Sequence, residues 1–202
     1  MRKALIFTLT LMLLLTACGG GEETNVVTQL QQQYAAVETA TMEAEIVCHY
    51  GDEVRTYTLL CAYSPEKSTV TVLAPENLAG ISAQVENGTL TLSYDDISLD
   101  AGTYSAAAVS PVVALPKLME AAAWGYPAEQ SEEMLGERTC IRLGCDLSDE
   151  PGTLYTTWFD AQSLLPLRSE ITVDGALLFE VAWSRFEVTL GAQTNETTNT
   201  TE

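Results

Sequence analysis

The sequence is poor in the residues from which catalytic and metal sites are built. It has one histidine, His49, and it has no Gly-x-Ser-x-Gly motif, no P-loop and no pair of histidines at zinc-binding spacing. It also lacks a Cys-x-x-Cys pair, which commonly supplies half of a structural zinc site. We therefore expect no enzymatic activity, no catalytic residue, no bound metal and no cofactor.

Positive charge is scarce as well. Nine Lys and Arg stand against 28 Asp and Glu, which gives a formal net charge of −19. A surface of this sign repels phosphate backbones and anionic lipid headgroups, so we expect neither nucleic-acid binding nor electrostatic adsorption to a membrane. The adjacent acids Asp95-Asp96 and Glu132-Glu133 are expected to be solvated surface, because adjacent acids arise by chance in so acidic a chain.

The N-terminus has the layout of a secretion signal. Arg2 and Lys3 precede an apolar run over residues 4–15, which is too short to span a bilayer as a helix. The run ends in Leu15-Thr16-Ala17-Cys18, which resembles the lipobox of bacterial lipoproteins. This resemblance implies that the Cys18 thiol receives a diacylglyceryl group and that the signal peptide, residues 1–17, is removed. The alternative is an N-terminal membrane anchor in which Cys18 is incidental.

A lipidated Cys18 predicts a protein tethered to the extracytoplasmic face of the bacterial cell membrane. Cleavage would leave 185 residues with a net charge of −21, because residues 1–17 contain two basic residues and no acid. Two acyl chains anchor a protein stably. We expect a flexible linker over residues 18–24, one domain over 25–190 and a disordered polar tail over 191–202.

The other four cysteines, Cys48, Cys61, Cys140 and Cys145, leave two alternatives open. Outside the cytoplasm an even number of cysteines allows two disulfides, and four cysteines have three connectivities. The other reading is four buried free thiols. A hairpin turning at residues 51–52 would place Cys48 opposite residues 54–56 and not opposite Cys61, so that pair would need a wider sheet or a bulge.

Two stretches have helical periodicity. Residues 25–40 carry an apolar residue at every third or fourth position, at Val27, Leu30, Tyr34 and Val37. A shorter helix is predicted around residues 115–124, with Pro116 in its first turn and Gly125 as its stop. We expect this second helix either to be core packing or to form a lid over a cavity.

The remaining chain alternates polar and apolar residues in the manner of β-strands. Asn87-Gly88 predicts a type I′ hairpin that pairs Val85 with Leu90 and Ala83 with Leu92. At the end of the chain, pairing Ile171 with Phe179 keeps the apolar faces together and requires a three-residue turn. A shift in the last strand predicts a bulge at 184–185, and the acidic loop 146–152 is expected to be solvated.

The order of these elements predicts an α+β fold: a curved antiparallel sheet that forms an unclosed β-barrel around the N-terminal helix and the short inserted helix. This layout resembles the LolA/LolB-like lipoprotein-carrier superfamily over residues 25–190. The resemblance is carried by Pro65, by Pro75 with the hairpin 87–94, and by the segment from Trp158 to Arg168. In the lipoprotein carrier a basic residue that controls the lid precedes the first of these prolines, whereas this chain has Ser64.

The resemblance implies two functions. In the first, an acyl chain or another hydrophobic ligand lies between the concave sheet and the second helix, and Met119→Asp abolishes its uptake without unfolding the domain. In the alternative, the interior is filled by the protein's own side chains and the domain docks a cell-wall or sporulation-related envelope protein. The candidate residues for the hydrophobic ligand are Leu115, Leu118, Met119, Trp124, Trp158, Phe179 and Trp183.

Overall fold

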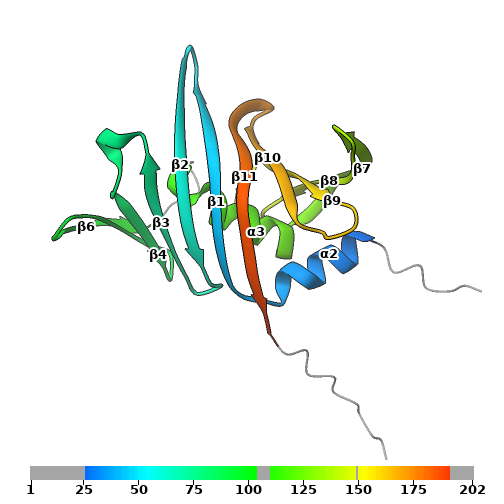
Figure 1. Cartoon of the computed structure of the whole chain (residues 1–202), viewed down its shortest axis with the longest axis horizontal. Helices are drawn as coiled ribbons and strands as arrows, with labels where there is room; N and C mark the ends of the chain where they lie inside the picture. Colours follow the sequence, from blue (N-terminus) through cyan, green and yellow to red (C-terminus); the bar gives the residue numbers. More distant parts are fainter. Residues whose placement is uncertain (1–25, 104–109, 149, 192–202) are drawn as a thin grey trace, which may run out of the picture.

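A computed structural model describes residues 26–103, 110–148 and 150–191 (Figure 1). The predicted Cys18 lipidation site and linker lie outside the described residues, as does the tail beyond Gly191. The elements are α2 (Val26–Ala35), β1 (Val37–Tyr50), β2 (Glu53–Tyr63), β3 (Lys67–Ala74), η2 (Glu76–Leu78), β4 (Ser82–Glu86), β5 (Thr89–Tyr94), β6 (Ile97–Thr103), α3 (Pro111–Trp124), β7 (Tyr126–Leu135), β8 (Arg138–Asp146), β9 (Thr153–Asp160), β10 (Pro166–Val173) and β11 (Ala176–Leu190).

The strands form one antiparallel sheet that does not close. Its order is β6-β5-β4-β3-β2-β1-β11-β10-β9-β8-β7, so β6 and β7 are the two edges. The first and last strands of the chain, β1 and β11, lie side by side in the middle of the sheet (Figure 1). The predicted fold class, an unclosed curved barrel with helices against it, is confirmed.

The predicted bulge in the last strand is confirmed, and it bends the centre of the sheet. Glu43 pairs with Arg185 and Ala44 pairs with Trp183, so β11 has Ser184 as an extra residue. The Ser184 hydroxyl donates to the carbonyl of Glu43 at 3.1 Å. A bulge increases the local bend and twist of its strand, which helps to give the sheet a concave face.

The Asn87-Gly88 hairpin has the predicted pairing. Val85 pairs with Leu90 and Ala83 with Leu92. Both turn residues, Asn87 and Gly88, have positive φ, as a type I′ turn requires. Register and turn chemistry therefore agree at this hairpin.

In the last hairpin Ile171 pairs with Phe179, as predicted. The predicted three-residue turn is wrong, because Val173 pairs with Ala176 across a two-residue Asp174-Gly175 turn. The register shift is made inside the strand instead, at Leu178, which has no partner on β10.

Both helices differ from their predicted bounds. The first ends at Ala35 and not near residue 40, because Val37 begins β1 and pairs with Leu190. The second begins at Pro111, so Pro116 lies beyond its first turn. Pro111 takes the first helical position, where a missing N–H has no cost, whereas Pro116 deprives the carbonyl of Val112 of its helical donor.

The sequence pattern missed one strand and placed the start of another too late. Residues 97–103, for which no strand was predicted, form β6, and β7 begins at Tyr126 and not near residue 132. In both, charged or small residues occupy much of the strand, so the alternation of polar and apolar residues is weak. Pairing with a neighbouring strand determines these two elements.

Helices α2 and α3 cover part of the concave face. The buried stripe of α2 is Val27, Leu30 and Tyr34, as the periodicity predicted. Helix α3 packs on β1, β2, β3, β8 and β9, and it also contacts α2. Together the helices and the sheet bury one hydrophobic core, which places the second helix in the core.

The four described cysteines are free and buried. Cys48 pairs with Arg55 and Cys61 pairs with Met42, as the hairpin predicted. Cys48 and Met42, the partner of Cys61, are six residues apart on β1. This separation is about 20 Å, so Cys48 and Cys61 are far beyond disulfide reach. Burial raises the pKa of Cys48 to about 11 and that of Cys61 to about 12, so these thiols stay protonated at neutral pH.

Gly125 ends α3, as predicted, but for a packing reason. Its φ is −65°, so it is not the left-handed cap that usually selects glycine. A Cβ at this position would lie 2.5 Å from the carbonyl oxygen of Ala121 and 2.6 Å from the Cβ of Cys145. Glycine therefore lets the end of α3 approach β8 closely.

Gly125→Ala should destabilise the fold by about 2 kcal/mol, because neither contact atom can move without shifting a helix or a strand. The measurement is chemical denaturation followed by circular dichroism. Gly191→Ala is the matched control, since the nearest atoms to its added Cβ belong to the flexible Glu38 side chain. Equal stability losses for the two variants would contradict this packing role.

Candidate functional site

The concave interior, where the hydrophobic ligand was expected, is filled by the protein's own side chains. Leu115, Leu118, Met119 and Phe179 are all buried in the core. The void between α3 and the sheet next to Met119 has a volume of about 10 Å³, and the void beneath Leu118 holds essentially nothing. Neither space holds an acyl chain.

The three candidate tryptophans are not brought together. Trp183 packs against the core with its ring edge to Phe186, and its indole N–H donates to the Ser169 hydroxyl at 2.9 Å. Trp124, at the end of α3, is 68% exposed. The third, Trp158, follows Thr157 and precedes Phe159, both of which face the interior, so its own side chain lies on the opposite face.

On that outer face Trp158 lies between two arginines. The guanidinium carbons of Arg142 and Arg168 are 5.4 and 5.3 Å from its ring. Its indole N–H donates to Glu133 at 2.9 Å, and this bond lowers the pKa of that carboxyl. Cation–π contacts of this kind stabilise a sheet surface. Because Trp158 lies on the outer face of the sheet, it is separated from the candidates for the hydrophobic ligand that are buried in the core.

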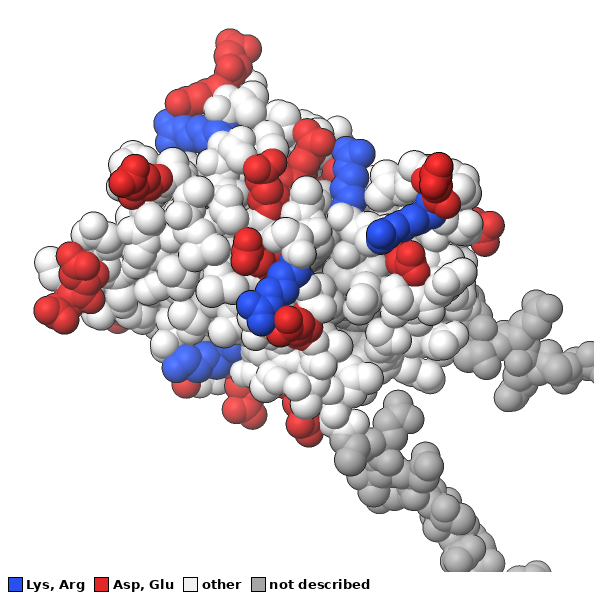
Figure 2. Space-filling model, in the orientation of Figure 1, with Lys and Arg blue, Asp and Glu red and all other residues white. Residues whose placement is uncertain are grey.

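Charged side chains pair extensively across the sheet. The Arg168 guanidinium, which contacts Trp158, also donates a hydrogen bond to the Glu180 carboxylate at 3.0 Å. The same carboxylate contacts the His49 imidazole at 2.9 Å. Figure 2 shows basic side chains beside acidic ones over the face in view. The histidine thus has a carboxylate partner on the sheet surface, and the described residues contain no cluster of three ligands for a metal.

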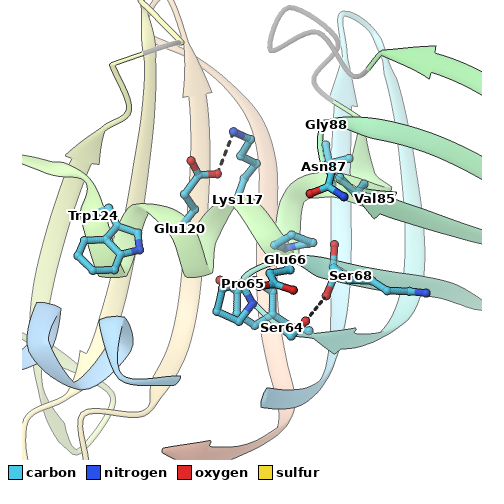
Figure 3. Close-up of a pocket in the computed structure, with 14 residues that line it drawn as sticks. Ser64, Pro65, Glu66, Ser68, Val85, Asn87, Gly88, Lys117, Glu120 and Trp124 are labelled. Carbon is cyan, nitrogen blue, oxygen red and sulfur yellow. Dashed lines mark hydrogen bonds and ion pairs between the residues drawn. The ribbon is translucent and has the colours of Figure 1, made fainter. Parts of the chain in front are cut away.

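A pocket of about 560 Å³ lies between α3 and the turn that joins β2 and β3. Helix α3 contributes Lys117, Glu120 and Trp124 to its wall, and the turn between β2 and β3 contributes Ser64 and Pro65 (Figure 3). Charged and hydroxyl groups line it together with apolar ones, so it suits an amphiphilic occupant better than a bare acyl chain. Its other lining residues are Tyr63, Glu66, Lys67, Ser68, Val85, Asn87, Gly88, Val113 and Pro116.

Sequence reasoning missed a cluster of ion pairs that joins the wall of this pocket to the buried Glu150. The Lys117 ammonium lies 2.9 Å from carboxylate oxygens of both Glu150 and Glu120, and the Tyr155 hydroxyl also donates to Glu150. Burial alone lowers the pKa of Lys117, but its bonds to Glu150 and Glu120 outweigh burial and hold that pKa above its usual value. The prediction that loop 146–152 is solvated is wrong for Glu150, which is buried.

The concave face of β4–β6 forms an apolar surface that α3 leaves largely open. The core residue Val70 pairs with Ala83, Ala83 with Leu92 and Leu92 with Leu99, so these side chains share one face of the sheet. The residues become more exposed toward the edge, where Leu99 is 63% exposed. We call this surface the open face; its outer residues are Leu92, Tyr94 (51% exposed), Ile97 (73%) and Leu99.

No protein-family model and no curated protein matches the chain. Among solved structures, a DUF1329 family protein from Desulfovibrio piger is similar at a TM-score of 0.51 and 13% identity, over 83% of this chain and 92% of that one. A LolA superfamily protein from Nitrosomonas europaea has a TM-score of 0.47 and 11% identity, over 82% and 93% of the chains. The GerS lipoprotein of Clostridioides difficile, solved with the CwlD amidase, has a TM-score of 0.37 and 15% identity, over 84% and 97%.

These similarities concern the fold. The unclosed antiparallel sheet that the sequence predicted is also the fold of the Desulfovibrio piger protein. Within the described residues no helix is long and apolar enough to cross a membrane. A shared fold does not determine a ligand or a partner, so function has to be argued from the sites of this chain.

Lys117→Met should destabilise the domain by about 3 kcal/mol, because it leaves Glu150 buried without its cation. Lys67→Met is the control, since Lys67 and its partner Glu86 are both about half exposed and 3.7 Å apart. That change should cost less than about 1 kcal/mol. Thermal and urea unfolding measure both variants, and a Lys117→Met protein as stable as the Lys67→Met protein would contradict the cluster's role.

Met119→Asp should unfold the domain, and not merely empty a cavity as the sequence suggested, because it places a carboxylate in a filled core. Trp124→Asp, five residues along the same helix, should leave the circular dichroism spectrum unchanged, since that side chain is exposed. A folded Met119→Asp protein would show that the interior can open.

Proposed function

We propose that the chain is a lipoprotein, tethered by Cys18 to the extracytoplasmic face of the membrane, whose domain docks another envelope protein through the open face. The observation that carries the proposal is the contrast between the two halves of the concave surface. The half under α2 and α3 is filled, whereas the half formed by β4–β6 exposes Tyr94, Ile97 and Leu99.

Exposed apolar side chains gathered on one surface favour a protein contact. Exposed apolar patches on soluble domains commonly mark interaction sites, since leaving such surface in water is unfavourable. The acidic charge of the chain opposes direct contact with anionic lipid headgroups, so the open face suits a protein better than a membrane surface. The Cys18 anchor would then hold the docking domain near the membrane.

A second candidate function is binding of an amphiphilic small molecule in the 560 Å³ pocket. Its volume lies in the range of ligand sites, which is about 300–1,000 Å³. Apolar walls from Pro65, Val85 and Val113 stand beside Ser64 and Asn87, which offer hydrogen bonds. This site replaces the acyl-chain site expected at Met119, where the described interior has almost no room.

The docking proposal predicts site-specific crosslinking in the cell envelope. With photoreactive benzoylphenylalanine in place of Tyr94, we expect one defined protein adduct on illumination, because position 94 lies within the contact. The control position is Tyr126 on the opposite edge strand, which is similarly exposed. Mass spectrometry of the adducts identifies the crosslinked species.

Three outcomes would contradict the docking proposal. They are no protein adduct from position 94, equal adducts from positions 94 and 126, and an adduct to lipid alone. The last outcome, together with a ligand recovered from the 560 Å³ pocket, would support the second candidate function.

A further inference from the structure

The two edges of the sheet differ in how they are protected. Edge strands attract further strands, and proteins commonly block them with proline, charge and bulges. Strand β7 has all three, with Pro127, a register shift between Pro127 and Glu129, and the acids Glu132 and Glu133. Strand β6 has no proline and a single charged residue, Asp100; its own register shift, beyond Asp100, leaves the pairing of residues 97–100 regular. No described strand pairs with the outer side of β6.

The side chains of β6 fit an added strand. Ile97 and Leu99 lie on the concave side and are largely exposed, and they continue the row of apolar residues that begins in the core. A strand laid beside β6 would place every second side chain against them, since successive residues of a strand point to opposite faces.

Charge selects what kind of strand would bind. Residues 82–103, which contain β4, β5 and β6, carry four acids and no Lys or Arg; the acids are Glu86, Asp95, Asp96 and Asp100. Two of them form the turn that leads into β6. A basic segment would be attracted, whereas a second copy of this chain would bring like charges together along the same edge.

We infer that the partner protein docks by adding an extended segment to the outer edge of β6 as a twelfth strand. The segment has apolar residues at alternate positions, which face the concave side beside Ile97 and Leu99, and Lys or Arg between or beside them. This inference rests on the docking function proposed above and specifies how the open face would be used.

The first test uses a defined probe, a short acetylated peptide of alternating Lys and Val. It is added to the full-length lipidated protein in phosphatidylcholine nanodiscs, whose zwitterionic surface does not attract the peptide. Hydrogen exchange should slow by about tenfold at the amides of residues 97–103 that point away from β5, because the added strand pairs with them. The effect should weaken with salt and be absent with a peptide of alternating Glu and Val.

Matched variants locate the contact. Leu99→Lys should abolish the protection, because it places a cation where the apolar side chains of the peptide would pack. Met134→Lys on β7 should leave it intact, although Met134 is as exposed as Leu99, at 63%. Protection of residues 126–135 in place of 97–103, or protection that survives Leu99→Lys, would overturn the inference.

The crosslinking experiment separates this inference from the proposed function. Leu99→Lys should remove the protein adduct formed from position 94. If the adduct persists in a folded Leu99→Lys protein, docking stands and pairing with β6 fails; if the parent protein forms no adduct, docking itself fails. An adduct between two copies of the chain, with a doubled mass in solution, would overturn the assignment of a basic partner.

Discussion

The pairing of β1 with β11 is the constraint on which the rest of the structure depends. It joins the beginning of the domain to its end, with Met42 opposite Phe186 and Ile46 opposite Val181, and so places two runs of sequential hairpins in one sheet. The bulge at Ser184 bends that junction. A sheet bent in this way has a concave face that must be covered, and α2 and α3 cover the part nearest the junction.

The two helices cover only part of the concave face. Helix α3 packs on β1–β3 and on β8 and β9, and its side chains leave almost no void against Phe159. Strands β4–β6 extend beyond it, so their apolar face stays exposed at Tyr94, Ile97 and Leu99. The concave side of this sheet therefore combines a filled core with an open apolar flank. The proposed docking function therefore rests on that flank and not on the fold.

Features set by nearby residues were predictable from the sequence. The Asn87-Gly88 hairpin, the Ile171–Phe179 pairing and the bulge at Ser184 follow from turn chemistry and from the two-residue period of strands. Features set by distant residues were not. Glu150 is buried because Lys117 comes to it from another element. Trp158 and Phe159 are adjacent apolar residues in a strand whose polar and apolar residues do not alternate, so the pattern could not show which of them faces the core. The open face was missed because its exposure depends on where α3 ends its coverage.

Native mass spectrometry of the full-length protein, extracted from its own membrane in mild detergent, tests the central claim most directly. A filled interior predicts a mass equal to the mature polypeptide with its N-terminal lipid and four free thiols, and no further lipid retained after the detergent is removed. A second lipid that stays bound at stoichiometric amounts would show that the interior opens to a hydrophobic ligand, and would contradict a core filled by the protein's own side chains.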